Sequence, residues 1–327
     1  MPTSERHENG AEETIDAINR KTGRNMPQAI ATAVILIVVI LACLLISIDV
    51  FVALLVVFML LALWELRVDF ATAGLHIPVV MLGICSTVTL VATYLSPRHI
   101  VAMAVCLSGS VVLVALAASI KMSFGSRLSL AVANKLSHTD AQARLESSFN
   151  HENGEHTHSR LSHVAVSVFT LLYIPLLGSG LIIALTGDHP VSHAITLVFL
   201  PALSDTGGLF AGAWLGRHKL SPRISPKKSV EGLIGSMLLA MGGAFAIFAC
   251  TYDASLWATR WWVPIVAGIL TGVVGTFGDL CASMLKRDIG IKDMGHLLKG
   301  HGGVMDRIDS ILLCAPFLCA LLWVTGL

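Results

Sequence analysis

The chain has 327 residues, of which 55% are hydrophobic and 13% are charged, and its mean hydropathy is +0.77. Soluble domains carry about 25% charged residues, so this composition excludes an ordinary soluble globular protein and indicates a protein of the lipid bilayer. The formal net charge of +1 gives no basis for nucleic-acid binding, which needs a clustered excess of basic residues. The seven cysteines lie in or beside apolar segments without CxxC spacing, so we expect neither disulfides nor a zinc site.

Nine apolar segments are long enough to cross a hydrocarbon layer of roughly 30 Å as helices. In chain order they cover residues 28–46, 49–64, 77–95, 100–119, 163–185, 193–214, 233–251, 262–281 and 308–326. The second segment is short and ends at Trp64-Glu65, and the sixth contains Asp205. The sequence therefore predicts an all-α polytopic membrane protein of about nine transmembrane helices.

These segments divide the chain into four regions. We expect a cytoplasmic N-terminal arm at 1–27, a four-helix membrane region at 28–120, a cytoplasmic polar loop at 121–162 and a five-helix membrane region at 163–327. The first segment follows a polar arm and lacks a small-residue cleavage site, so it is interpreted as a retained span rather than a signal peptide. The polar loop contains four histidines, His138, His151, His156 and His158. A solvated loop is favoured there over a metal site.

The basic residues are distributed unevenly over the connections between spans. When alternate connections are assigned to opposite sides of the membrane, all of the 22 Lys and Arg residues except Arg98 and Arg260 fall on one side. By the positive-inside rule, that side is the cytoplasm. We therefore expect a multi-pass protein of a cell membrane, such as a bacterial inner membrane, with a cytoplasmic N-terminus and a C-terminus on the opposite side.

Acidic residues converge between the last two spans. Asp279 lies where the eighth span reaches the interface, and Asp306 and Asp309, three residues apart, share one face of the helix that begins the ninth. Carboxylates at that depth need counter-ions. A divalent cation such as Mg²⁺, held by one or two carboxylates and by substrate phosphates, meets that need.

Basic residues and glycines accompany these acids. Backbone amides at Gly302 and Gly303 are able to approach a phosphate because no Cβ is in the way. Positive charge for phosphate oxygens comes from Lys286, Arg287, Lys292 and Arg307. Taken singly, the bases also fit the positive-inside rule and the aspartates also fit a helix N-terminus. The whole ordered string instead indicates phosphate chemistry at a membrane surface.

The string from Ser283 to Asp309 resembles the signature of the phosphatidate cytidylyltransferases, also called CDP-diacylglycerol synthases. That signature runs Ser, any, apolar, Lys-Arg, four residues, Lys-Asp, and later His-Gly-Gly, apolar, any, Asp-Arg, apolar, Asp, and the chain meets it at each of these positions. Similar stretches around 204–208 and 216–232 extend the resemblance to roughly residues 195–327. The chain departs at Ala282, where the family usually has Glu, and at Lys299, where it usually has Pro.

The resemblance implies a reaction and roles for residues of the catalytic region, 163–327. The phosphate of phosphatidate would attack the α-phosphorus of CTP, with Mg²⁺ required, at an active site that faces the cytoplasm. Asp279 and Asp306 would be metal ligands, with Asp309 as a third, and Asp205 would lie near the nucleotide unless it only ends the sixth span. The implied phosphate contacts are Ser225, Lys227, Lys228, Lys286, Arg287, Lys292, His301, Gly302, Gly303 and Arg307. A homodimer is also implied.

Three alternatives accompany this interpretation. Ser225 and Pro226 also fit the start of a helix, whose N-terminus beside two lysines would hold a triphosphate. His301 either donates to pyrophosphate or stiffens its loop. For the protein as a whole, the alternatives are a CTP-dependent transferase for another lipid phosphate, a weakened paralogue, a non-catalytic scaffold and a transporter. A transporter predicts repeated halves with midplane charges, and the chain has no such repeat.

Overall fold

The computed structural model of the chain describes residues 26–119, 160–222, 224–291, 294–295 and 303–327. The N-terminal arm up to residue 25 and the four histidines of the polar loop lie outside the described residues. The helices are α2 (Met26–Ile46), α3 (Ile48–Thr72), α4 (Val79–Leu95), α5 (His99–Ser119), α8 (Arg160–Leu171), the π-helical turn η1 (Leu172–Leu176), α9 (Leu177–Ala184), α10 (Pro190–Leu215), α11 (Val230–Thr251), α12 (Ala254–Ala258), α13 (Val263–Asp288) and α14 (Met305–Thr325). The strands are β1 (Lys219–Ser221) and β2 (Ser225–Ser229).

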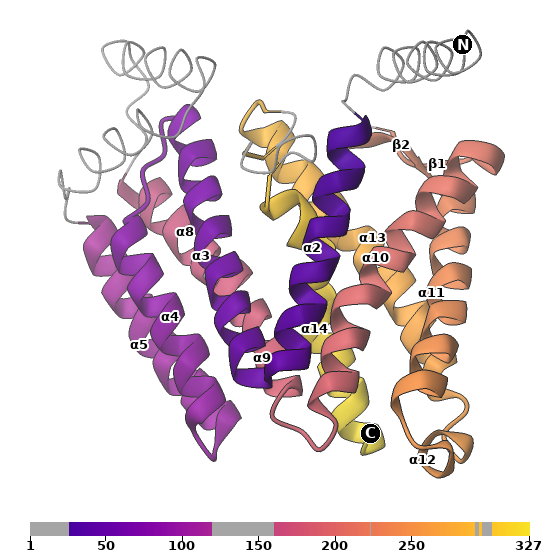
Figure 1. Ribbon diagram of the computed structural model, residues 1–327. Coiled ribbons are helices and arrows are strands. Elements are labelled where there is room, and N and C mark those ends of the chain that lie inside the picture. Colours follow the sequence, from indigo (N-terminus) through magenta and orange to yellow (C-terminus); the bar gives the residue numbers. More distant parts are fainter. Residues whose placement is uncertain (1–25, 120–159, 223, 292–293, 296–302) are drawn as a thin grey trace, which may run out of the picture.

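Each predicted apolar segment coincides with a helix, with α8, η1 and α9 together forming the fifth. In the described part of the chain, seven helices are long and apolar enough to cross a membrane, and Ala31–Ile46 and Val79–Leu95 are shorter apolar helices. This is the helix composition of a multi-pass membrane protein. In Figure 1, α2 begins at one end of the bundle and α14 finishes at the other, as an odd number of spans requires.

The second helix does not end where the hydropathy falls. We predicted an end near residue 64, but α3 continues to Thr72 and includes Glu65 and Asp69. These two acids are only 2% and 6% exposed, so they face protein rather than an aqueous interface. The eighth helix is longer than predicted as well, because α13 continues to Asp288 and carries Lys286 on its last turns.

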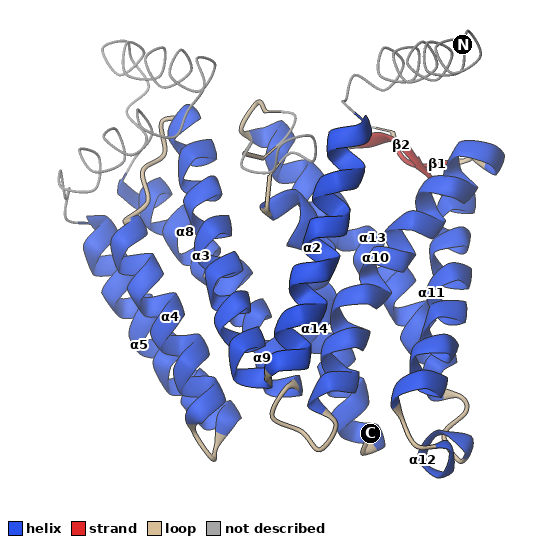
Figure 2. Cartoon of the chain, viewed as in Figure 1, coloured by secondary structure: helices blue, strands red, loops and turns tan. Residues whose placement is uncertain are grey.

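Two short strands interrupt the all-α pattern. β1 and β2 pair in antiparallel fashion, with Lys219 opposite Ser229 and Ser221 opposite Ser225, and Figure 2 shows this hairpin at one end of the bundle. The alternative of a helix start at Ser225 is therefore wrong, because strand pairing holds that residue extended. The helix begins at Val230 instead, where the Ser229 side chain accepts a hydrogen bond from the Gly232 amide at 3.1 Å.

Close helix packing in the second half of the chain depends on glycine. α11 packs against both α10 and α13, and α13 packs against α14. Gly268 and Gly272 of α13 face α11, and a Cβ on Gly272 would lie 2.8 Å from the Met237 Cα. Only a residue without a side chain lets the two backbones approach this closely.

Substituting Ala for Gly268 is expected to destabilise the protein. The new Cβ would collide with the Met241 backbone, and overpacking of this kind typically costs about 1–3 kcal/mol. Gly242 of α11 is the matched control, because a Cβ there meets nothing within 4 Å and Ala at a helix interior is favoured by up to about 1 kcal/mol. Thermal unfolding in detergent measures the difference, and equal midpoints for the two variants would contradict the packing.

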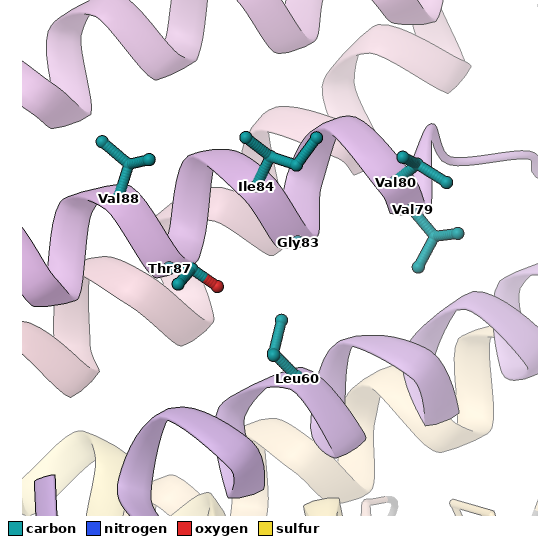
Figure 3. Close-up of a pocket in the computed structure, with 7 residues that line it drawn as sticks. All are labelled: Leu60, Val79, Val80, Gly83, Ile84, Thr87 and Val88. Carbon is teal, nitrogen blue, oxygen red and sulfur yellow. The ribbon is translucent and has the colours of Figure 1, made fainter. Parts of the chain in front are cut away.

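An apolar groove of about 420 Å³ lies between α3 and α4. Figure 3 shows Leu60 of α3 pointing toward Gly83 and Thr87 of α4. None of the described residues that line this groove is charged, so it does not belong to the polar site described next.

Candidate active site

The ends of α13 and α14 are joined by a lysine–aspartate pair. Nζ of Lys286 lies 2.8 Å from Oδ1 of Asp306, and the two side chains are 13% and 10% exposed. The other Asp306 oxygen, Oδ2, accepts a hydrogen bond from the Met294 amide at 3.2 Å. Asp306 also lies in the first turn of α14, where the positive end of the helix dipole favours a carboxylate. Charge and hydrogen bonds therefore hold Asp306 in one place.

A second pair joins the hairpin to α13. Nζ of Lys228 lies 2.8 Å from Oδ2 of Asp279 and donates a hydrogen bond to the Thr276 carbonyl oxygen at 2.8 Å. The hairpin determines the position of Lys228, because β2 runs directly into α11 and ends beside α13. The Asp279 side chain is 40% exposed, so this pair is more open to solvent than the pair of Lys286 and Asp306.

Two further carboxylates lie beside Asp279. Asp205 lies well inside α10, which continues to Leu215, so the alternative that it only ends the sixth span is wrong. The Ser310 hydroxyl lies 3.4 Å from Oδ1 of Asp205 and 3.4 Å from Oδ1 of Asp309, and it donates to one oxygen at a time. Asp309 is buried and lies within electrostatic range of both Asp205 and Asp279. The three acids therefore repel one another.

The three predicted metal ligands share one neighbour. Tyr173 lies in η1, where Pro175 interrupts the regular helix, and π-helical turns often occur at functional sites. Its hydroxyl is buried and has no hydrogen-bond partner among the described residues. Asp279, Asp306 and Asp309 all lie within electrostatic range of this hydroxyl. Asp279 and Asp306 thus occupy the same region of the molecule, although each is paired with its own lysine.

The remaining predicted residues are placed differently. Arg287 is exposed on the last turn of α13, and Arg307 is half-buried within electrostatic range of Asp205. Gly303 was expected to expose its amide to a phosphate. In the structure its backbone lies so close to the Met294 carbonyl oxygen that a Cβ would collide with that oxygen. Ser225 lies at the turn end of the hairpin, away from Lys228. The Lys227 side chain and residues Lys292, Lys299, His301 and Gly302 lie outside what the structure describes.

The donor chemistry fits a divalent cation. Among the described residues, no three histidine, cysteine or acidic side chains form a group that could hold a metal ion between them. Mg²⁺ does not require such a cage, because it is usually bound by one or two carboxylates together with substrate phosphates and water. A bound cation would reduce the mutual repulsion of Asp205, Asp279 and Asp309.

Sequence reasoning missed four side chains near these acids. Glu65 and Asp69 of α3 and Tyr173 of η1 lie outside the motif-bearing stretch, and Ser310 directly follows it. The signal for Glu65 and Asp69 was present, because two acids one turn apart in an apolar helix are costly and usually functional. Ala282, which replaces the usual Glu of the resembling family, is 1% exposed, so α13 provides no carboxylate at that buried position.

Comparison with known proteins identifies relatives of this chain. The sequence pattern of the cytidylyltransferase family matches residues 27–325. A phosphatidate cytidylyltransferase of Mycobacterium bovis is 39% identical over 152 residues, which are 46% of this chain and 48% of that protein. One of Staphylococcus haemolyticus is 34% identical over 158 residues, 48% of this chain and 59% of that protein. An uncharacterized protein of Escherichia coli, YnbB, is 39% identical over 126 residues, 38% of this chain and 41% of that protein. The chain spans about half the length of the curated relatives it matches.

Proposed function

The chain belongs to the cytidylyltransferase family, and on that basis we propose that it transfers the cytidylyl group of CTP to phosphatidate. An oxygen of the lipid phosphate attacks the α-phosphorus of CTP, the bond from that phosphorus to the bridging oxygen breaks, and pyrophosphate leaves. CDP-diacylglycerol, a precursor for phospholipid synthesis, is the product. The observation that carries the proposal is the pair of lysine–aspartate contacts, Lys228 with Asp279 and Lys286 with Asp306, near the buried Asp309 and the exposed Asp205.

The chemistry of the reaction explains why such residues are needed. A triphosphate and a phosphomonoester repel each other, so catalysis depends mainly on neutralising charge and on in-line positioning. Lys228 and Lys286 already lie beside carboxylates and are proposed to neutralise phosphate oxygens of the substrates. Further proposed phosphate contacts are Ser225, Lys227, Arg287, Lys292, His301, Gly302, Gly303 and Arg307. Asp205 is proposed to lie near the nucleotide. A phosphate oxygen is already a nucleophile, so no serine or histidine base is required.

Asp279, Asp306 and Asp309 are the proposed ligands of Mg²⁺, with one or two of these carboxylates holding the ion at a time together with substrate phosphates and water. A bound Mg²⁺ ion would withdraw charge from the α-phosphate and the leaving pyrophosphate. All three lie within electrostatic range of the Tyr173 hydroxyl, which supports this assignment. Asp309 is the most buried of the three, so it is the ligand least able to turn toward water.

The positive-inside pattern supports an active site that faces the cytoplasm. The hairpin and the ends of α13 and α14 that bear the acids lie at one end of the bundle (Figure 1), and that end is proposed to be cytoplasmic. The family resemblance supports a homodimer, which crosslinking of the detergent-solubilised protein tests.

A pyrophosphate-release assay tests the proposed function. The purified protein in detergent micelles should release pyrophosphate from CTP only when phosphatidate and Mg²⁺ are both present. Omitting the lipid, adding EDTA and replacing CTP by ATP are the three controls. Release with an isoprenoid phosphate but not with phosphatidate would assign another lipid substrate. Absence of release with every lipid phosphate would contradict the proposed function and favour a scaffold or a transporter.

A further inference from the structure

The first half of the chain contributes two buried acids to the catalytic end of the bundle. Glu65 and Asp69 lie one turn apart on α3 and therefore on the same helix face. They are 2% and 6% exposed. A carboxylate buried to this degree destabilises a protein unless other groups satisfy it. Backbone amides of the connection between α13 and α14 and of the first residue of α14 meet one oxygen of each acid.

Each acid accepts a hydrogen bond from the backbone of that connection. Oε2 of Glu65 accepts from the Met305 amide at 2.8 Å, and Oδ1 of Asp69 accepts from the Gly295 amide at 3.4 Å. Met305 is the first residue of α14, whose N-cap residue, Val304, makes no side-chain capping bond. The free amides at a helix start need acceptors. Glu65 supplies one from a helix 240 residues away in the sequence.

The connection has the right shape for this contact. Gly295 has a positive φ of 61°, and a Cβ on it would collide with the Glu65 carboxyl group. A Cβ on Gly303 would lie 2.7 Å from Oε2 of Glu65. Both glycines thus bring the backbone directly against the carboxylate, and a larger residue at either position would move α14 away from α3.

Charge links this contact to the active site. Asp69 lies within electrostatic range of Glu65, Asp306 and Lys286. Lys286 is paired with Asp306, so its single positive charge faces acids from both α3 and α14. A shift of the α14 start would therefore change the distance between Lys286 and Asp306.

From these contacts we propose that Glu65 and Asp69 are positioning residues, which fix the start of α14, and with it Asp306, relative to Lys286. Neither residue needs to touch a substrate. The inference rests on the proposed function, since Lys286 and Asp306 are assigned to it. It also assigns a role in the reaction to α3, which lies outside the stretch that carries the family signature.

Variants at Glu65 separate positioning from simple stabilisation. Glu65→Ala removes the acceptor for the Met305 amide, whereas Glu65→Gln keeps a carbonyl oxygen of the same reach. Displacement of a catalytic group by about 1 Å costs up to about 10²-fold. We expect Glu65→Ala to lower kcat per folded molecule about 10- to 100-fold, with KM for CTP changed far less. Glu65→Gln should recover most of the lost kcat, and Asp69→Ala should show a smaller loss because its bond is longer.

The matched control is Phe51→Leu. Phe51 is fully buried in the same helix, about 21 Å from Glu65 along the axis, so its variant loses stability without touching the connection. Hydrogen–deuterium exchange of the peptide that contains Met305 should increase in Glu65→Ala and stay unchanged in Phe51→Leu at equal folded fraction.

Two results would overturn the inference. One is a kcat per folded molecule in Glu65→Ala equal to that of the wild type. The other is a parallel loss of kcat in Phe51→Leu, which would mean that both residues act through stability alone. If the wild type released no pyrophosphate, the proposed function would fail by itself. The exchange measurement would then still decide whether Glu65 holds the start of α14.

Discussion

Asn in place of Asp279 or Asp306 is expected to lower pyrophosphate release by about 10²- to 10³-fold. Asn preserves the size of the side chain and one oxygen acceptor but removes the negative charge. Each variant therefore loses an ion pair, with Lys228 in one case and with Lys286 in the other. Each also loses a proposed ligand of Mg²⁺. The rate should be measured at saturating CTP and phosphatidate over a range of Mg²⁺ concentrations, because a lost ligand raises the concentration needed for half-maximal rate.

The control for these variants is Asp188→Asn. Asp188 is exposed in the connection between α9 and α10. That connection lies at the end of the bundle opposite to the hairpin (Figure 1), so the loss of Asp188 should leave the rate unchanged. Full activity in both Asp279→Asn and Asp306→Asn would disprove the metal assignment. Unfolding midpoints should be recorded alongside, because Asp306 is the more buried of the two and its variant leaves a buried lysine without its partner.

The spans and the acid-rich connection were predictable because both depend on short-range patterns. A run of apolar residues indicates a membrane helix regardless of what surrounds it. The order of charges between Asp279 and Asp309 likewise lies within one segment. Long-range partners leave no such local trace. Lys228 and Asp279 meet only because the hairpin brings β2 beside α13, and strand pairing between separate segments cannot be inferred from either segment alone.

The errors at Glu65 and Ser225 have the same origin. A hydropathy window treats Glu65 as the end of a span, since it cannot register an amide 240 residues away that donates a hydrogen bond to the carboxylate. Ser225-Pro226 fits a helix start, but Pro is tolerated equally in a strand with a free edge. Pairing with residues 219–221 makes this segment a strand rather than a helix start. At both Glu65 and Ser225, a contact with another segment outweighed the preference of the local sequence.

The Lys286–Asp306 pair offers the second large effect. Lys286→Met should lower the free energy of unfolding by about 3–5 kcal/mol, because it leaves a largely buried carboxylate without its counter-charge. Lys228→Met should cost less, because its partner Asp279 is 40% exposed and water solvates it. Thermal or denaturant unfolding in detergent measures which variant loses more stability. A larger loss of unfolding free energy in Lys228→Met than in Lys286→Met would contradict the difference in burial between the two pairs.

Combining Lys286→Met with Asp306→Leu separates folding from catalysis. Apolar residues of similar volume often replace a buried ion pair without loss of stability, so the double variant should unfold near the wild-type midpoint and well above Lys286→Met. Its pyrophosphate release should nevertheless stay as low as that of Asp306→Asn, since the pair's phosphate-neutralising base and its metal-binding carboxylate are both lost. Stability recovered without activity would assign the pair to the reaction. Recovery of both would mean that Lys286 and Asp306 serve only to join α13 to α14.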